Sequence, residues 1–159
     1  MNVLFLLFFA FISRASIPDI SIIREGYLKG LKSEKTTNQF IKLFSENTTL
    51  SPLQVSYSGA FYCLKAKHVA MPHQKLSNLS KGLGLINKAA KLDTNDIEIR
   101  FLRFSIENEA PSFLINPNHL ATDKTFIVKH FTSSHPFAKI IYDYMIKKGG
   151  CKPIDFSKK

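Results

Sequence analysis

The sequence predicts an all-α domain of six or seven helices, packed as helical hairpins in an irregular α-bundle. Apolar residues recur at three- and four-residue spacing along most of the chain, most regularly over residues 76–111. Short segments that begin or end helices, such as Ser-Pro, Asp-Thr-Asn and Gly-Gly, separate these periodic stretches. The 159 residues, of which 45% are hydrophobic, suit one domain, which we assign to residues 16–148.

The first residues, 1–15, indicate a secretory signal peptide. Val3–Ile12 is an unbroken apolar run, too short for the roughly 20 residues of a membrane span. Small residues at Ser13 and Ala15 place cleavage after Ala15. The alternative is a buried N-terminal helix. No second hydrophobic run follows, so we expect an exported mature chain without a transmembrane span, in the periplasm, at the cell surface or outside the cell.

Two helices are expected in the first third of the chain. The first covers residues 17–31, and its apolar residues at helical spacing are Ile20, Ile23, Tyr27, Leu28 and Leu31. A polar link follows at 32–35. Thr36 or Thr37 then caps a second helix, which ends near Asn47.

The third helix has the clearest start signal in the chain. Ser51 can cap it, Pro52 suits its first turn, and Gln54 can reach back as in a capping box. The helix runs to about His68 and carries apolar stripes on two sides. It should therefore contact neighbours on both sides.

The fourth helix, at about 73–92, has a single narrow apolar stripe. Its far side carries three lysines, Lys81, Lys88 and Lys91. Gly82 lies beside the stripe. It either allows a neighbouring helix to approach closely or is simply a weak position, since glycine costs about 1 kcal/mol relative to alanine inside a helix.

The fifth helix is expected to be central in the fold. The turn at 93–96 precedes it, and Asn95 can cap it, with Glu98 three residues further on. Apolar residues line two nearly opposite sides, and Ala110-Pro111 ends the pattern. A helix that is apolar on two sides belongs between two neighbours.

The last third of the chain predicts a loop and two more helices. The loop covers 112–121, and Thr122 can cap a short helix after it. The last helix is expected to start at 134–136, and two lysines and a glycine at 147–149 suit its end. Residues 149–159 are expected to form a flexible C-terminal tail.

The charge is strongly basic but dispersed. The formal net charge of +10 becomes +9 if Arg14 leaves with the signal peptide. Lysines spread along the chain are typical of a solvated surface, and export argues against a nucleic-acid partner. A basic exported protein would still be attracted to anionic envelope polymers or lipid head groups.

The two cysteines leave their pairing open. In an oxidising compartment Cys63 and Cys151 could form a disulfide that closes a long loop. Cys63 nevertheless lies inside a helical pattern, where a single cysteine is typical of a small buried hydrophobe.

No catalytic residue, metal ligand or cofactor is predicted. His130 and His135 have half of a zinc-finger spacing, but no cysteine pair accompanies them. His68 lies at the edge of an apolar stripe and fits a hydrogen-bonded packing histidine. Neither a nucleophile elbow nor a phosphate-binding glycine loop is present, so the sequence favours a protein that is not an enzyme.

Two arginines on the fifth helix are the first candidates for a binding site. Arg100 and Arg103 lie on a helix that is apolar on two sides, so at least one should be partly buried. A buried arginine needs a bidentate partner. We expect an internal carboxylate, which could be Asp96, Glu107 or a more distant acid, and the alternative is an anionic ligand. Together with the lysines of the fourth helix, they are the candidate binding residues.

The centre of the chain resembles a tetratricopeptide repeat. Gly59 and Tyr62 have the spacing of the small and aromatic packing residues in the first helix of such a repeat, and the turn at 93–95 resembles the turn that ends one. The resemblance implies tetratricopeptide-like (TPR-like) helical hairpins. Thr94 stands where the family usually has proline, and the segment 62–86 is about eleven residues longer than the 34-residue period allows.

A wider pattern resembles a group of uncharacterised, exported bacterial helical proteins. It runs from Ser58-Gly59-Ala60, through Glu98-Ile99-Arg100-Phe101-Leu102-Arg103, to Ala110-Pro111. The resemblance implies a helical fold and export, and it carries no catalytic residue.

Three functional hypotheses follow. The first is a non-enzymatic, exported module for protein–protein interaction, whose partner is another envelope protein, because helical-repeat scaffolds form concave binding faces from two-sided helices. The second is a binder of an anionic envelope ligand through the Lys/Arg face. The third is a small hydrolase or metalloenzyme centred on the histidines.

Overall fold

The structure is a computed structural model that describes residues 16–157. Within this range the chain forms seven α-helices and two short 3-10 helices, with no strand, which confirms the predicted all-α class. The α-helices are α1 (Ile20–Gly30), α2 (Glu34–Ser45), α3 (Pro52–His68), α4 (Pro72–Leu92), α5 (Ile97–Glu107), α6 (Pro117–His130) and α7 (Ala138–Lys147). The 3-10 helices are η1 (Ser112–Leu114) and η2 (Pro153–Phe156).

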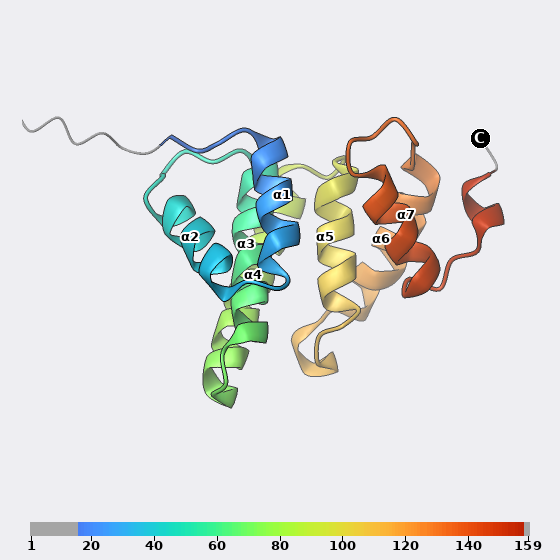
Figure 1. Ribbon diagram of the computed structural model, residues 1–159. Helices are drawn as coiled ribbons and strands as arrows, with labels where there is room; N and C mark the ends of the chain where they lie inside the picture. The colour runs from blue at the N-terminus through green and yellow to red at the C-terminus, as the bar shows by residue number, and fades with distance from the viewer. Residues whose placement is uncertain (1–15, 158–159) are drawn as a thin grey trace, which may run out of the picture.

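The helices form two groups on either side of α5 (Figure 1). On one side lie α1 to α4, with α3 and α4 as a long hairpin, and on the other lie α6 and α7. Each group has an apolar core, one around Phe61 and the other around Ile127 and Ile141. Helix α5 supplies Leu102 to the first core and Phe101 to the second. It therefore joins the two groups.

The central position predicted for α5 is confirmed, but its cap differs from the prediction. Nine of its eleven residues are buried. Asp96, not Asn95, is the cap, and its carboxylate accepts from the backbone N–H groups of Glu98 at 2.8 Å and Ile99 at 3.0 Å. Asn95 lies one residue too early, in a turn where its own N–H donates to Asp93.

Two other caps differ from the prediction, and both of these lie earlier in the chain than the sequence predicts. Ser33 caps α2, and its hydroxyl accepts from the N–H of Thr36, so the predicted caps Thr36 and Thr37 lie inside the helix. Asn116 caps α6, which places Thr122 in its second turn and shortens the predicted loop. In each case an earlier side-chain acceptor allows the helix to begin sooner.

The start of α3 is as predicted. The Ser51 hydroxyl accepts from the Gln54 N–H at 3.3 Å, and the Gln54 side chain accepts from the Ser51 N–H at 2.9 Å. This reciprocal capping box, with Pro52 at the first helical position, orients the longest hairpin of the fold.

Helices α3 and α4 approach closely at two glycines. A Cβ atom on Gly59 would lie 2.6 Å from the carbonyl oxygen of Gly82, and one on Gly82 would lie 2.4 Å from the sulfur of Cys63. No larger side chain fits at either position without moving the helices apart. Of the two interpretations of Gly82, close helix approach is therefore the one observed.

The C-terminal segment packs against the second group of helices, whereas the sequence predicts a flexible tail. The last helix begins at Ala138, after a turn rather than within 134–136. Beyond it, Cys151 is buried in the second core, and the Phe156 ring on η2 stacks edge-on against Phe131 and Tyr142. These buried and aromatic contacts fix the path of the chain up to residue 157.

The predicted signal peptide, residues 1–15, lies outside the described residues. Between residues 16 and 157, no helix combines the length and the apolar character that crossing a membrane would require.

Candidate functional site

Arg100 and Arg103 both bind Asp123 of α6. The Arg103 guanidinium donates to both carboxylate oxygens of Asp123, at 2.6 and 2.7 Å. Arg100 donates to one of them at 2.8 Å, and its other nitrogens donate to the Thr94 carbonyl oxygen. Asp123 is fully buried, so the acid and both arginines form an internal cluster between α5 and α6.

The partner of the two arginines is thus the distant acid among the predicted alternatives. Asp96 is occupied as the cap of α5, and Glu107 lies 3.0 Å from the His119 ring at the other end of the same helix. Because their N–H groups donate to Asp123 and Thr94, the two arginines link α5 to α6 and to the turn that precedes α5.

The three candidate lysines of α4 lie apart from the arginine cluster. Lys81 lies over the ring of Tyr62 and donates to its hydroxyl at 2.9 Å. Lys88 and Lys91 are exposed. None of the five candidate binding residues lines the large groove described below. The geometry therefore brings the arginines together but gathers no Lys/Arg face around a cavity.

Cys63, Cys151 and His68 all contribute to helix packing. Cys63 and Cys151 form no disulfide, and each lies in or against a different core. Burial raises the pKa of the Cys63 thiol to about 12, so this thiol is not poised as a nucleophile. The His68 ring lies 2.8 Å from the Gly30 carbonyl oxygen, as expected for a packing histidine. The described residues contain no cluster of three metal-ligating side chains.

A second buried carboxylate, Glu98, joins α5 to α1 and α3. The Arg24 guanidinium of α1 donates to both of its oxygens, at 2.9 and 2.7 Å, and the Tyr57 hydroxyl of α3 donates to one of them. His135, before α7, lies 3.6 Å away. Burial and then the charge of Glu98 raise the pKa of Tyr57, and the hydrogen bond to Glu98 raises the pKa of Arg24.

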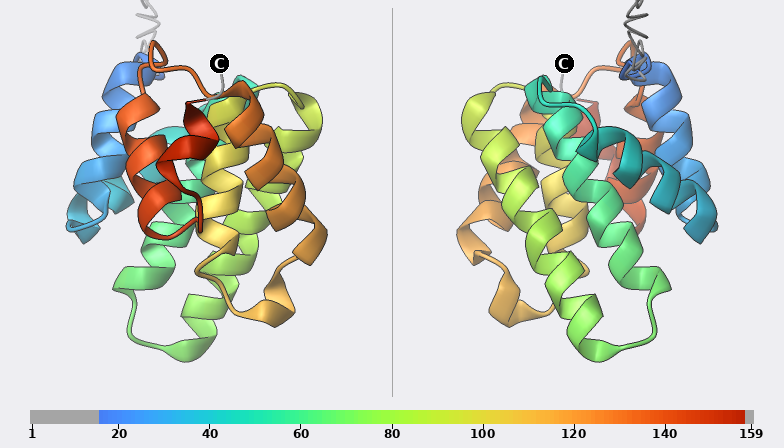
Figure 2. Two further views of the ribbon diagram at one scale, coloured as in Figure 1. Left: turned by 90° about the vertical axis from the view of Figure 1, so that its right-hand side faces the viewer. Right: turned by 90° about the vertical axis from the view of Figure 1, so that its left-hand side faces the viewer.

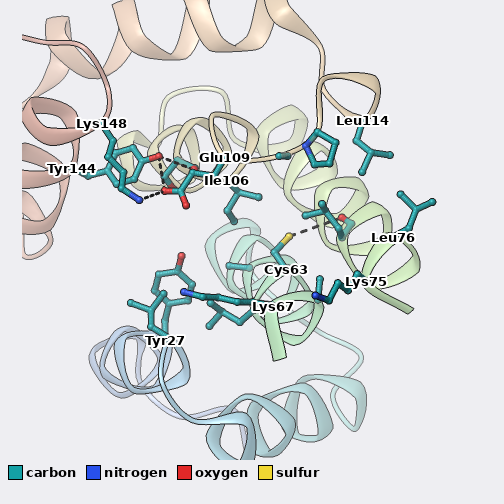
Figure 3. Close-up of a pocket in the computed structure, with 18 of the residues that line it drawn as sticks. Tyr27, Cys63, Lys67, Lys75, Leu76, Ile106, Glu109, Leu114, Tyr144 and Lys148 are labelled. Atoms are coloured by element: carbon teal, nitrogen blue, oxygen red, sulfur yellow. Dashed lines mark hydrogen bonds and ion pairs between the residues drawn. The ribbon is translucent and has the colours of Figure 1, made fainter. Parts of the chain in front are cut away.

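An apolar groove of about 910 Å³ lies between the two helix groups. Its walls come from α1, α3 and α4 on one side and from α5, η1 and α7 on the other. We call it the central groove, and Figure 3 shows it in close-up. The apolar side chains that line it include Leu28, Leu31, Leu64, Leu76, Leu79, Ile106, Phe113 and Leu114.

The charged side chains of the central groove are mostly cationic. Lys67 of α3 and Lys75 of α4 lie on one side and have no ion pair within the described part of the chain. Across from them, Lys148 donates to Glu109 at 2.9 Å, and the Tyr144 hydroxyl lies 3.2 Å from the same carboxylate (Figure 3). Burial raises the pKa of Tyr144 to about 12, so the hydroxyl stays protonated at neutral pH.

Sequence reasoning missed this groove because its residues resemble core residues. Leu28, Leu31 and Leu76 fall on the apolar stripes of their helices, yet they are 37%, 37% and 43% exposed. Phe113, at 74%, is the most exposed of the large hydrophobic side chains among residues 16–157. The sequence did contain one signal, which is an apolar stripe too wide for a single neighbouring helix to cover. This signal can be used only when the position of the neighbouring helix is known.

The central groove combines a largely apolar lining with a few polar and charged side chains. Its one carboxylate, Glu109, is held by Lys148, and the only thiol on its lining, Cys63, is protonated at neutral pH. Apolar area with a few fixed polar groups suits recognition of another molecule. In comparisons with known proteins, no family model, no curated protein and no solved structure matches this chain.

Proposed function

We propose that this protein is a non-enzymatic interaction module that holds a partner protein in the central groove. One observation carries the proposal. Of the eight large hydrophobic side chains that are exposed among residues 16–157, four line this groove: Leu28, Leu31, Leu76 and Phe113. Scattered apolar residues are normal on a protein surface, but a contiguous patch of them marks an interaction site.

The proposal includes export and a partner in the cell envelope. The support is the apolar run Val3–Ile12 followed by small residues up to Ala15, as in a secretory signal. The hairpin of α3 and α4, with small residues at its contact, supports a TPR-like arrangement in which helix pairs present a binding face. N-terminal sequencing of protein from the exported fraction tests this part, with a start at Ser16 expected.

The groove is tested by isolating partners with matched variants of the full chain. Leu76→Asp and Phe113→Asp place a charge in the apolar lining, where an uncompensated carboxylate opposes binding. Leu92→Asp is the control, because Leu92 lies on the same helix as Leu76, is 60% exposed and does not line the groove. We expect a partner that is recovered with the wild type and the control and is lost with both groove variants.

The variants must first be shown to fold, by circular dichroism and thermal unfolding. Since all three substitutions replace exposed side chains, we expect melting temperatures close to that of the wild type. Recovery of the same partner with folded Leu76→Asp and Phe113→Asp chains would contradict the proposal.

A further inference from the structure

We infer that the occupant of the central groove is an amphipathic helix of the partner, with an apolar face and acidic flanks. This inference rests on the proposed function and adds the chemistry of the partner. Three features of the groove carry it: its size, the helical form of its walls, and the sign of its charged side chains.

The size of the groove suits helical side chains. A helix with its side chains is about 10–12 Å wide and rises 5.4 Å per turn, so two turns fill roughly 1,000 Å³. The groove offers about 910 Å³. Because the groove is open to water, it can take in the apolar face of a helix of about two turns or more, while the opposite face of that helix stays outside.

The walls present ridges of the kind that helices pack against. Leu28 lies in the last turn of α1, with Leu31 three residues further on as its C-cap residue, and Leu76 and Leu79 are three residues apart on α4. Residues at this spacing lie on one face of a helix and form a ridge. The apolar rim is exposed to water rather than enclosed, with Phe113 standing at its edge. An enclosed tunnel would shield an acyl chain from water more completely than this open groove does. An open, ridged surface instead suits the side chains of another protein.

The charges of the groove select acidic flanks. Three lysines and one glutamate line it, and only Lys148 has a carboxylate partner there. Lys67 and Lys75 are exposed, lie on the same side and are free of ion pairs within the described residues. The chain that begins at Ser16 carries +9, which is the +10 of the full sequence less Arg14, and this charge adds a long-range attraction for an acidic partner. Glutamate or aspartate beside the apolar face of the partner helix would form ion pairs with Lys67 and Lys75.

Synthetic peptides of about four helical turns test the inference. The first carries leucines at i, i+3, i+4 and i+7 with glutamates elsewhere, and the second replaces the glutamates by lysines. A third has the composition of the first in scrambled order, which removes the apolar face. Fluorescence anisotropy against the full chain should show the acidic peptide binding at least about tenfold more tightly than either of the others. Its affinity should fall as salt increases.

A charge reversal identifies the residues responsible. The double variant Lys67→Glu/Lys75→Glu should invert the preference, so that the lysine peptide binds more tightly than the glutamate peptide. The matched control, Lys88→Glu/Lys91→Glu, changes the net charge by the same amount on exposed positions of α4 outside the groove. It should retain the wild-type preference and lower the affinity only slightly, through the long-range charge.

Several results would overturn the inference. These are equal binding of the acidic and basic peptides, an unchanged preference after reversal of Lys67 and Lys75, and undiminished peptide binding by Leu76→Asp. A fluorescent fatty acid that binds the wild type and displaces the acidic peptide would assign the groove to acyl chains instead. A partner that needs the groove but shows no preference for acidic peptides leaves the proposed function standing and removes only this inference. Loss of groove dependence in partner isolation removes the proposed function itself.

Discussion

At the scale of single residues, the fold depends on two buried carboxylates with arginine partners. Glu98 joins α5 to α1 and α3, and Asp123 joins α6 to α5. A buried ion pair adds little compared with well-packed apolar residues, but removing one partner leaves a largely buried charge without a counter-charge. These contacts therefore specify which helices meet, and they fail sharply when one partner is changed.

We expect Glu98→Gln to lower the free energy of unfolding by about 3 kcal/mol, because it leaves Arg24 without a counter-charge. Chemical denaturation measures the change. Glu25→Gln is the control. Glu25 lies next to Arg24 on α1 and pairs with Lys29, and both of these side chains are 64% exposed. That exposed pair should contribute less than about 1 kcal/mol. Equal losses in the two variants would show that the buried pair is not special.

The sequence could predict that Arg100 and Arg103 need an acid, but not which one. The requirement follows from their own helix, which is apolar on two sides. Asp123 lies twenty residues beyond Arg103, on α6, whose predicted start was wrong. The side of α6 that faces α5 could therefore not be derived from the sequence. The sequence suggested only a capping role for Glu98, because it lies near the start of a helix. Its ion-pair partner, Arg24, is 74 residues away. Local patterns contain no information about such distant pairings.

At the scale of helices, the approximate position of each α-helix was predictable, whereas the first residue was predicted correctly only for α3. The apolar period locates α3, α4 and α5 within a residue or two of the observed bounds. The caps at Ser33 and Asp96 were missed because several adjacent residues have suitable side chains, and packing of the helix selects among them. Only at Ser51 do three signals coincide, and there the boundary was correct.

Alanine substitutions at two glycines of the α3–α4 hairpin should change the stability of the protein in opposite directions. Gly59→Ala should destabilise the protein by about 1–3 kcal/mol, because its Cβ would meet the backbone of Gly82 and the helices would have to separate. Gly84→Ala, on the same hairpin, has no atom within 4 Å of its Cβ. It should instead stabilise by up to about 1 kcal/mol through helix propensity.

Thermal and chemical unfolding of the two variants give this comparison directly. If Gly59→Ala stabilised the protein as Gly84→Ala does, the close approach of α3 and α4 would not be needed for their packing.

At the scale of the whole molecule, burial of weak acids makes stability depend on alkaline pH. Burial raises the pKa of Cys63 from 9.0 to about 12 and that of Tyr144 from 10.0 to about 12, and it also raises the pKa of Tyr27 and Tyr57. Between these values the unfolded chain loses protons that the folded chain keeps. The folded state therefore loses relative stability as pH rises through this window.

We expect the contribution of these groups to be complete below about pH 9 and to decrease as pH rises toward about 12. Denaturant titrations at a series of pH values measure it. Cys63→Ala removes one of two cysteines whose pKa burial raises from the ordinary value of 9.0, and Cys151 remains. The decrease in stability between pH 9.0 and the tyrosine value of 10.0 should therefore be smaller in the variant. An equal decrease in wild type and variant would show that the Cys63 thiol is not protected from ionisation by burial.

The central groove could not be predicted because it belongs to no single element. Its walls are the parts of six helical segments that the two cores leave uncovered, and the direction of each helix decides what remains. The amphipathic pattern of α1 and α4 was predicted, but only their arrangement separates covered from exposed leucines.

The two apolar cores on either side of α5 have a consequence for local opening. Each group of helices has a separate core, and α5 together with Tyr27, which packs against both, is the main link between them. We therefore expect two cooperative units, and amide hydrogen exchange should follow that division, with α6 and α7 exchanging together and separately from α3 and α4. A helix seated in the groove would touch both units and slow exchange in both, so protection far from the contact would report that the groove is occupied.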